Sequence, residues 1–327
     1  MTTFGLSALD LDLEAEASLI AETLRAQLGD LKRRCLVLGL SGGIDSAVCT
    51  ALATRAVGPE RVVALLMPDR DTPADATRRA ADFGRRLGVE VITEDIDPTL
   101  ESLGCFRRRD LAVRRVFPDL AEEYRAKITL AGEVLDRDRV PYFNLVVDQG
   151  DGGQLSRRMP ADAYLQVIAA TNMKQLVRTL VEYTHAESRN YAVLGTPNRL
   201  EYALGFFVRG GDGLADLKPI AHLYKSQVFA MAAHLGVDEA IRSAIPSTDT
   251  YSLPQTQQEF YFGVSLSEVD LLLYAQEHAV PSEDIAHGMG LSLEQVERVL
   301  RYMAGKRLGA ARASREALLV RPVPVHA

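Results

Sequence analysis

Short apolar runs alternate with segments of helical periodicity along the first hundred residues. The apolar runs at 35–40, 61–67 and 89–96 have the length and the bounding residues of strands buried in a parallel sheet. Apolar positions recur at helical spacing around and between them, at 10–29, from Ser46 onward and at 72–87. This alternation predicts an α/β protein with a doubly wound, Rossmann-like parallel sheet. Ligands of such sheets bind beyond the carboxyl ends of the strands.

Local signals refine these elements. Thr72 stands before Pro73 and is the expected cap of the helix at 72–87. Farther along, a helix is expected to open at Thr171 and to continue through Val181. The apolar run at 190–195 predicts another short strand of the sheet.

The middle of the chain is less regular. An arginine-rich cluster begins at Cys105, and a strand-like run follows at 141–148. We interpret residues 104–160 as an insertion. The expected organisation is therefore one domain over 1–275 that carries this insertion, followed by a helical C-terminal extension over 276–327.

Composition narrows the class of protein. The 327 residues carry a formal net charge of −7, which argues against a broad nucleic-acid surface. The three cysteines form no C-x-x-C pair and show no zinc-ligand spacing, which favours a reducing cytoplasm. No apolar run approaches the roughly 20 residues that a membrane span needs. We expect a cytoplasmic protein with no nucleic-acid or membrane partner.

Candidate chemistry centres on the turn at 41–46, Ser-Gly-Gly-Ile-Asp-Ser, between the first strand and its helix. Glycines allow the backbone to approach a ligand closely, and N–H groups, hydroxyls and a helix N-terminus together form an anion cradle. Asp45 lies beside this cradle. A carboxylate next to phosphate groups indicates that Mg²⁺ lies between them.

The turn resembles the SGGxDS pyrophosphate loop of the N-type ATP pyrophosphatases, and later motifs narrow this resemblance to the ammonia-dependent NAD⁺ synthetases. The segment G-T-x-N-x-x-E of those enzymes is matched by Thr196, Asn198 and Glu201. Their G-(Y/F)-F-T-K-Y-G-D-G-x-x-D segment is similar to residues 205–216, with Arg209 in place of the lysine. A Tyr-Lys pair and a P-(S/T)-A-D segment correspond to residues 224–225 and 246–249.

This resemblance implies an enzyme that uses ATP and Mg²⁺ to adenylate a carboxylate and then amidates it with ammonia. It implies catalytic roles for Asp45, Lys225 and Ser247, and metal binding by Asp45 and Glu201. Substrate contacts are expected from Asn172, Arg178, Arg209 and Asp216. The residues expected to bind ATP are Gly39, Ser41, Gly42, Gly43, Ile44, Asp45, Ser46, Met67, Arg70, Thr196, Lys225 and Ser247.

The resemblance also implies a homodimer that amidates nicotinic acid adenine dinucleotide. The length leaves no room for a glutaminase domain, so ammonia is expected to be free or to come from a separate glutaminase. Leu176 occupies the place of an arginine that the family attributes to dinucleotide binding, and the family's His-Lys-Arg segment has no counterpart in the tail. A paralogue that amidates another carboxylate, possibly carrier-bound, therefore stays open.

Two other classes also stay open. A sulfur-inserting relative would need a cysteine, and Cys105 is the candidate in a loop. Residues 282–303 could form a DNA-reading helix-turn-helix, although the acidic charge argues against it.

Overall fold

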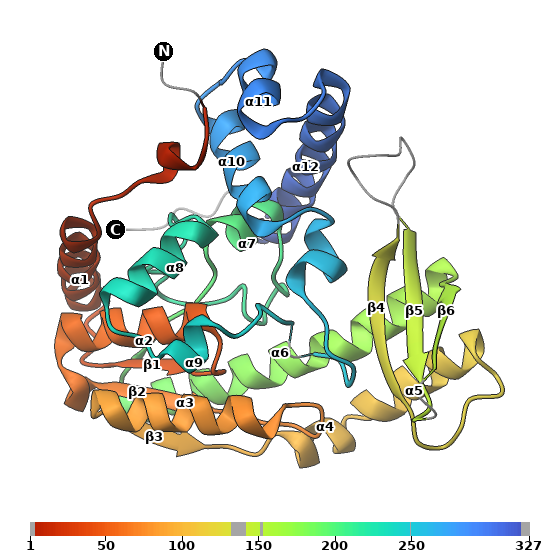
Figure 1. The fold of residues 1–327 in the computed structure, drawn as a ribbon. Coiled ribbons are helices and arrows are strands. Elements are labelled where there is room, and N and C mark those ends of the chain that lie inside the picture. The colour runs from red at the N-terminus through yellow and green to blue at the C-terminus, as the bar shows by residue number, and fades with distance from the viewer. Residues whose placement is uncertain (1–3, 132–141, 151–152, 249, 322–327) are drawn as a thin grey trace.

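A computed structural model describes residues 4–131, 142–150, 153–248 and 250–321. Its centre is a parallel sheet of four strands in the order β3-β2-β1-β7 (Figure 1). The strands are β1 (Leu36–Gly39), β2 (Val62–Leu66), β3 (Glu90–Thr93) and β7 (Ala192–Val193). The predicted α/β fold with a parallel sheet is therefore confirmed. Each strand is somewhat shorter than the apolar run that predicted it.

Alternating residues of the strands bury both faces of this sheet. Leu36 and Leu38 of β1 join the apolar cluster formed with one set of helices, whereas Val37 joins the cluster on the opposite face. The helices packed in the first cluster are α1 (Leu13–Asp30), α2 (Ile44–Val57), α3 (Ala74–Leu87), α8 (Lys225–His234) and α9 (Glu239–Arg242). A strand that is buried on both faces reads as a continuous apolar run, which is why the sequence signal was clear.

The opposite face is covered by a long helix, α6 (Ala161–Arg189), through side chains such as Val177 and Ala186. The sequence predicted a helix from Thr171 to Val181, and these bounds were wrong. The helix starts directly after Pro160 and ends at Asn190, whose backbone is left-handed with φ of 60°. Buried polar residues, Thr171, Lys174 and Thr179, interrupt the apolar periodicity of this helix.

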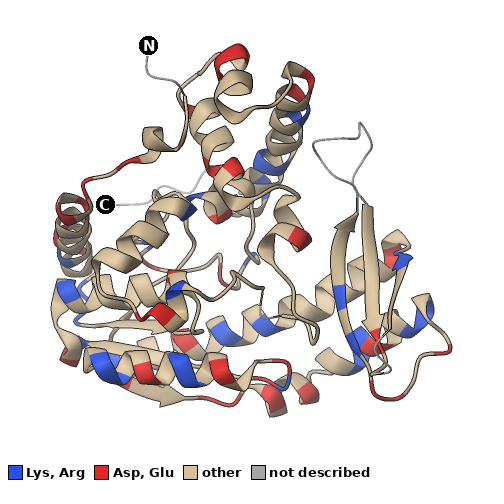
Figure 2. Cartoon of the chain, in the orientation of Figure 1, with Lys and Arg blue, Asp and Glu red and all other residues tan. Residues whose placement is uncertain are grey.

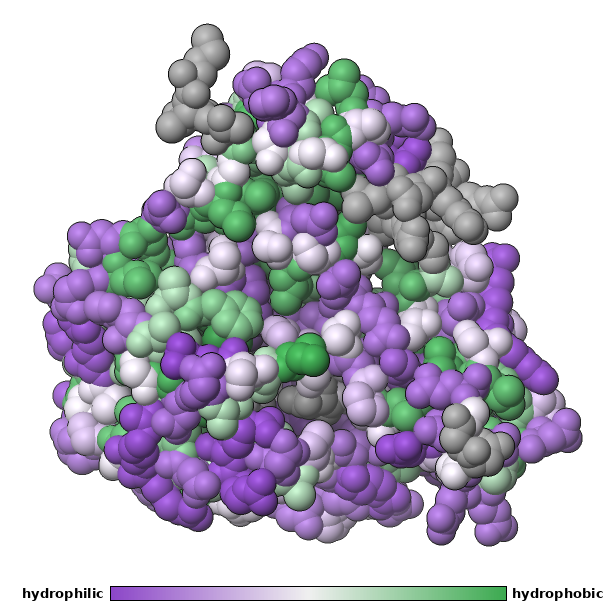
Figure 3. Space-filling model, viewed as in Figure 1, coloured by the Kyte–Doolittle hydropathy of each residue, from purple (hydrophilic) through white to green (hydrophobic). Residues whose placement is uncertain are grey.

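The expected cap of α3 was also wrong. The helix begins at Ala74 with Pro73 as its N-cap. The Thr72 hydroxyl instead accepts a hydrogen bond from the backbone N–H of Asp69 at 3.0 Å. This bond closes the loop that follows β2. The outward side of α3 carries charges of both signs, and the surface there is mainly hydrophilic (Figures 2 and 3).

A second, antiparallel sheet lies beside the N-terminal half of α6 (Figure 1). Its strands are β4 (Arg125–Ala131), β5 (Tyr142–Asp148) and β6 (Gln154–Arg158), in the order β4-β5-β6. Ile128, Leu145 and Val147 pack in one apolar cluster with residues of α6 and of α5 (Cys105–Val116). The short helix α4 (Asp97–Ser102) leads into α5.

Most of the remaining elements form a fourth apolar cluster around the C-terminal helices. They are α7 (Arg199–Leu204), α10 (Leu266–Glu277), α11 (Ser282–Met289), α12 (Leu293–Ala313), the short turn η1 (Leu6–Leu9) and the π-helical turn η3 (Gln258–Phe262). The short turn η2 (Pro59–Arg61) lies apart from this cluster, directly before β2. Within the described ranges, we find no helix with the length and apolar character that crossing a bilayer requires.

Candidate functional site

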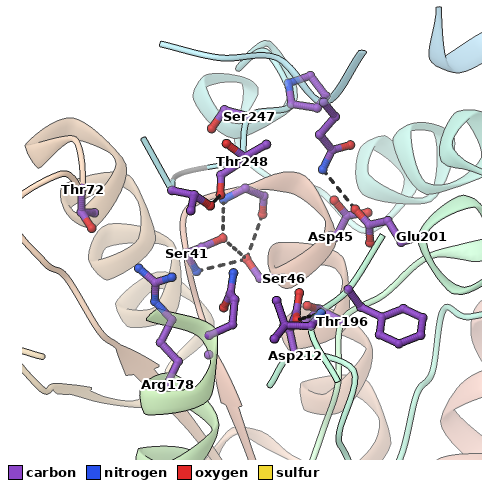
Figure 4. Close-up of a pocket in the computed structure, with 18 of the residues that line it drawn as sticks. Ser41, Asp45, Ser46, Thr72, Arg178, Thr196, Glu201, Asp212, Ser247 and Thr248 are labelled. Atoms are coloured by element: carbon purple, nitrogen blue, oxygen red, sulfur yellow. Dashed lines mark hydrogen bonds between the residues drawn. The ribbon is translucent and has the colours of Figure 1, made fainter. Parts of the chain in front are cut away.

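A pocket of about 720 Å³ opens at the carboxyl ends of β1 and β2. Its lining includes the turn between β1 and α2, the loop after β2, one side of α6 and the segments that follow β7 and α9. Ligands of parallel sheets bind at this edge. Figure 4 shows part of this lining.

The turn at 41–46, called the cradle below, is held by its own short side chains. The Ser46 hydroxyl accepts the N–H of Ser41 at 3.2 Å and donates to the carbonyl of Gly43 at 3.0 Å. The Ser41 hydroxyl accepts the N–H of Gly43 at 3.2 Å. Gly42 has φ of 84°, and a Cβ there would lie 2.4 Å from the carbonyl oxygen of Ala76. Only glycine fits this position, so the backbone presents its N–H groups at the N-terminus of α2.

Two carboxyl groups lie next to each other beside the cradle (Figure 4). Asp45 accepts a hydrogen bond from the Asn198 amide at 2.9 Å and forms an ion pair with the buried Lys225. Glu201 accepts a hydrogen bond from the Gln257 amide at 3.0 Å. Burial and the nearby Asp45 raise the pKa of Glu201 to about 8. A half-buried pair of carboxylates that repel each other suits a divalent cation, and Mg²⁺ commonly binds one or two carboxylates together with phosphate oxygens.

The ammonium group of Lys225 lies near both carboxyl groups and pairs with Asp45. Burial alone would lower its pKa, but the carboxylates of Asp45 and Glu201 outweigh burial and the net shift is upward. Its ammonium group therefore stays charged behind Asp45. The side chain itself does not line the pocket.

The sequence model of the NAD synthase family matches residues 16–113 and 153–308 of this chain. An NH₃-dependent NAD⁺ synthetase of Rhizobium meliloti is 48% identical over 320 residues, covering 98% of this chain and 96% of that protein. A synthetase of the same description from Thermotoga maritima is 33% identical over 85% of this chain and 91% of its own length. The chain belongs to the NAD synthase family.

Solved structures agree on the fold. The NMN synthetase of Francisella tularensis aligns with a TM-score of 0.65 at 22% identity, covering 95% of this chain and 99% of its own. An NH₃-dependent NAD synthetase of Campylobacter jejuni, solved with a nitrate ion, aligns with a TM-score of 0.63 at 19% identity and covers 95% of this chain and 100% of its own.

The family match includes α11 and most of α12, so the helix pair considered as a DNA reader belongs to the family's own domain. It leaves 114–152 unmatched, inside the interval interpreted as an insertion.

Most residues predicted for the site lie in the pocket wall. They are Gly39, Ser41, Gly42, Gly43, Ile44, Asp45, Ser46, Met67, Asn172, Arg178, Thr196, Glu201 and Ser247. Asp249, the last residue of the motif that contains Ser247, lies outside the described residues.

Besides Lys225, three predicted residues are not part of the pocket wall. Arg70 pairs with Asp97 and Glu101 on the outer surface. Arg209 donates to the carbonyl of Arg315 at 3.3 Å. The Asp216 carboxylate accepts the backbone N–H of Val193 at 2.8 Å and thereby holds β7 in place. In this structure the three side chains are engaged by protein groups that the sequence could not reveal.

A buried ionic network lies beneath the loop after β2. The ammonium group of Lys174 lies 2.9 Å from an oxygen of Asp69 and 2.7 Å from one of Asp71. Arg109 of α5 also pairs with Asp71. Burial alone would raise the pKa of Asp71, but Arg109 and Lys174 hold it below its ordinary value. The network ties α5 and α6 to the pocket.

Arg178 connects this network to the pocket. Its Nη2 lies 3.1 Å from Asp69, and its Nε lies 3.5 Å from the carbonyl of Met67. Its Nη1 makes no hydrogen bond in the described part of the chain, and the side chain reaches toward the cradle (Figure 4). Leu176, in contrast, is 43% exposed and lies outside the pocket wall.

Two further acidic side chains in the wall were missed by sequence reasoning. Burial raises the pKa of Glu182 to about 7, and the nearby Asp212 adds to this shift. A backbone hydrogen bond from Gly39 and the charge of Arg178 oppose it. Burial likewise raises the pKa of Asp212 to about 6. Glu182 stands one helical turn beyond Arg178, and Asp212 lies inside the matched 205–216 segment, so both positions carried a signal. Asn198, which was matched in a motif but given no role, and Gln257, which was not singled out, position the carboxylate pair.

Cys105 offers no support for sulfur chemistry. Its thiol is 1% exposed and donates to the carbonyl of Ala170 at 3.1 Å, and it does not line the pocket. Burial raises the pKa of this thiol, which disfavours the reactive thiolate.

Proposed function

We propose that this chain adenylates the carboxylate of nicotinic acid adenine dinucleotide with Mg·ATP and amidates it with ammonia. The products are NAD⁺, AMP and pyrophosphate. The observation that carries the proposal is the cradle with the Asp45–Glu201 pair beside it, in a chain of the NAD synthase family. A carboxylate reacts with ammonia only after its oxygen becomes part of a good leaving group, and AMP is such a group.

The residues of the cradle supply what pyrophosphate departure needs. Backbone N–H groups at the N-terminus of α2 and the Ser41 hydroxyl would be donors for the charge that develops on the leaving group, while the Ser46 hydroxyl, which donates to the Gly43 carbonyl, holds the turn in shape. Ser247 enters the same pocket from the opposite wall. Lys225 holds Asp45 in place, and Asn198 orients its other oxygen.

Asp45 and Glu201 would hold Mg²⁺. Bound there, the ion would neutralise charge on the phosphates as they separate. Without a cation, burial and the nearby Asp45 raise the pKa of Glu201 and so favour its protonated form.

Arg178 is the residue we assign to an anionic group of the substrates. Asp69 fixes its guanidinium group, and one nitrogen remains directed to the pocket. We infer that it supplies the contact that the family's arginine, replaced here by Leu176, makes in relatives. Asn172 lies six residues, or about 1.7 helical turns, earlier in the same wall.

We also propose that the protein acts as a homodimer. Leu165, Leu176 and Leu180 of α6 are 64%, 43% and 63% exposed and share one side of the helix. Three large apolar side chains in a row outside the pocket support contact with a second copy of the chain. Sedimentation of L176S/L180S should show monomers where the wild type shows dimers.

The nitrogen source is ammonia, free or supplied by a separate glutaminase. All three cysteines are unpaired, which supports a reducing compartment, and we propose that this is the cytoplasm.

The test of the function is a product assay by mass spectrometry. The protein, Mg·ATP and ammonium should form NAD⁺ only when nicotinic acid adenine dinucleotide is added, with one AMP and one pyrophosphate for each NAD⁺. ATP binding without NAD⁺ formation would overturn the assignment of the acceptor and would favour a paralogue that amidates another acid.

A further inference from the structure

The pocket is longer than its phosphate end. Helix α6 lines it with one face, whose pocket-facing positions include Tyr164, Ile168, Thr171, Gln175, Arg178 and Glu182. At 1.5 Å per residue, Tyr164 lies about 21 Å along the helix from Arg178. Gly39 and Met67 of the central sheet lie against the Glu182 end, because a Cβ on Gly39 would meet a Glu182 oxygen at 2.7 Å and the Met67 methyl at 3.1 Å. The Tyr164 end therefore reaches well beyond the nucleotide cradle.

Aromatic rings form the wall at this far end. Phe143 of β5 stacks on Tyr164 with ring centres 4.4 Å apart and planes within 16°. Phe260 of η3 lies 6.4 Å from Phe143 and 5.6 Å from Tyr251. All four residues line the pocket. Stacked and edge-on rings of this kind offer flat apolar surface to another planar ring.

The Tyr251 hydroxyl at this end makes no hydrogen bond of good geometry within the residues that the structure describes, and the residue is only 7% exposed. Burial raises the pKa of Tyr251, and an interaction with the Thr171 hydroxyl opposes this shift. The Thr171 hydroxyl donates its own proton to backbone carbonyls of α6 at 3.1 Å. A buried hydroxyl with a poorly formed hydrogen bond is costly, so a ligand atom that bonds it well would recover part of that free energy.

Part of this wall lies outside the family match. Phe143 belongs to the segment 114–152 that the NAD synthase model leaves unmatched, whereas Tyr164, Tyr251 and Phe260 fall within the match. The second sheet packs on α6 through its apolar face and thereby carries Phe143 into the pocket. The segment thus completes a binding surface in the same chain.

We propose that Phe143, Tyr164, Tyr251 and Phe260 form a subsite for a heteroaromatic ring of the acceptor substrate, with the Tyr251 hydroxyl bonded to a polar atom of that ring. The inference rests on the proposed function, which supplies an acceptor with a pyridine ring and an adenine ring. ATP would bind in the half of the pocket that contains the cradle. The subsite thus affects affinity for the acceptor and leaves affinity for ATP unchanged.

The experiment measures steady-state NAD⁺ formation by the wild type and three variants. F143L keeps apolar volume but removes the ring, and Y251F removes only the hydroxyl. Y142L is the matched control, because Tyr142 precedes Phe143 on β5 but points to the other face and is 38% exposed. Melting temperatures of all four proteins report folding, and Y251F tests the subsite even if F143L is unstable.

The expected result is a KM for nicotinic acid adenine dinucleotide that rises roughly three- to tenfold in F143L and Y251F. The KM for ATP and kcat should stay within about twofold, and Y142L should match the wild type. Inhibition by nicotinic acid mononucleotide then identifies the ring. A Ki that also rises in F143L places the pyridine ring in the subsite, and an unchanged Ki places the adenine there.

Two other outcomes overturn the inference. An unchanged acceptor KM in both variants, or an equal rise in the KM for ATP, would show that this wall does not bind the acceptor. These outcomes are distinguishable from failure of the proposed function, because the wild type then still forms NAD⁺. A wild type that forms no NAD⁺ overturns the function, and the subsite falls with it.

Discussion

At one end of the pocket a single strand, turn and helix supply the cradle, with its donors and Asp45 all within residues 41–46. At the other end Phe143, Tyr164, Tyr251 and Phe260 come from separate elements that meet only through packing of the second sheet. The first end is defined by local backbone geometry. The second is defined by long-range packing. Under the proposed function, the nucleotide chemistry is fixed locally, whereas acceptor recognition depends on the tertiary structure.

The largest effect should follow from removing charge at the cradle. D45N keeps the shape of the side chain and a group near Lys225, but it removes half of the carboxylate pair. Pyrophosphate release at saturating ATP should fall by roughly 10³-fold, as expected for loss of a group that stabilises charge in the transition state. D97N is the control, since Asp97 binds Arg70 outside the pocket wall. Turnover of D45N within tenfold of the wild type would remove Asp45 from its assigned role.

The next effect tests the buried ionic network of Lys174, Asp69 and Asp71, which lies between the two ends of the pocket. K174M leaves Asp69 and Asp71 buried without their shared cation. We expect a loss of roughly 3 kcal/mol in the free energy of unfolding, measured with urea. R70M breaks only a surface ion pair and should change stability by less than about 1 kcal/mol. Equal stabilities for the two variants would contradict the structural role given to Lys174.

Alanine substitutions at the two glycines of the cradle compare a position with positive φ and a backbone clash with a position that has neither. G42A places a methyl group 2.4 Å from the Ala76 carbonyl at a φ of 84°, whereas Gly43 has φ of −88° and its nearest neighbour would be the Ser41 hydroxyl at 3.3 Å. G42A should lower stability by roughly 2 kcal/mol and raise the KM for ATP at least tenfold. G43A should do less of both. If the order of the two variants is reversed, the described cradle geometry is wrong.

The smallest effect is a pH dependence at Glu182. Its pKa is raised from an ordinary 4.5 to about 7, so its contribution to stability is fully present below pH 4.5 and is lost as the pH rises through 7. E182Q stays neutral. Because Glu182 partly faces the pocket, we discount the full shift for solvent screening. The free energy of unfolding of E182Q relative to the wild type should therefore grow by only about 2 kcal/mol between pH 5 and pH 8.

Thermal or urea unfolding at both pH values checks this prediction. E187Q, a change at an exposed glutamate near the end of the same helix, should show no such growth. A stability difference between E182Q and the wild type that stays constant with pH would show that Glu182 is already ionised at pH 5.

Much of the fold could be predicted because its signals are local. The runs at 35–40 and 61–67 are apolar on both faces of the sheet, and the cradle follows one of them directly. The bounds of α6 could not be predicted, because Lys174 is a charged residue that the core accommodates only through Asp69 and Asp71.

The same limit applies to the site. Asp45 and Ser46 could be assigned from the turn that contains them. Arg70 and Asp216 looked equally suitable, but their partners, Asp97 and the backbone of Val193, are set by tertiary structure. Tyr251 carried no sequence signal, because the role proposed for it depends on neighbours that other segments supply.

The central claim is that the acceptor carboxylate attacks the α-phosphate of ATP, and isotope transfer tests it most directly. Nicotinic acid adenine dinucleotide labelled with ¹⁸O in its carboxylate is incubated with Mg·ATP and ammonium, and the products are weighed by mass spectrometry. The account predicts one ¹⁸O atom in AMP and none in pyrophosphate, because the oxygen that joins the α-phosphate leaves with AMP. Formation of ADP with the label in inorganic phosphate would contradict the account, since the attack would then occur at the γ-phosphate.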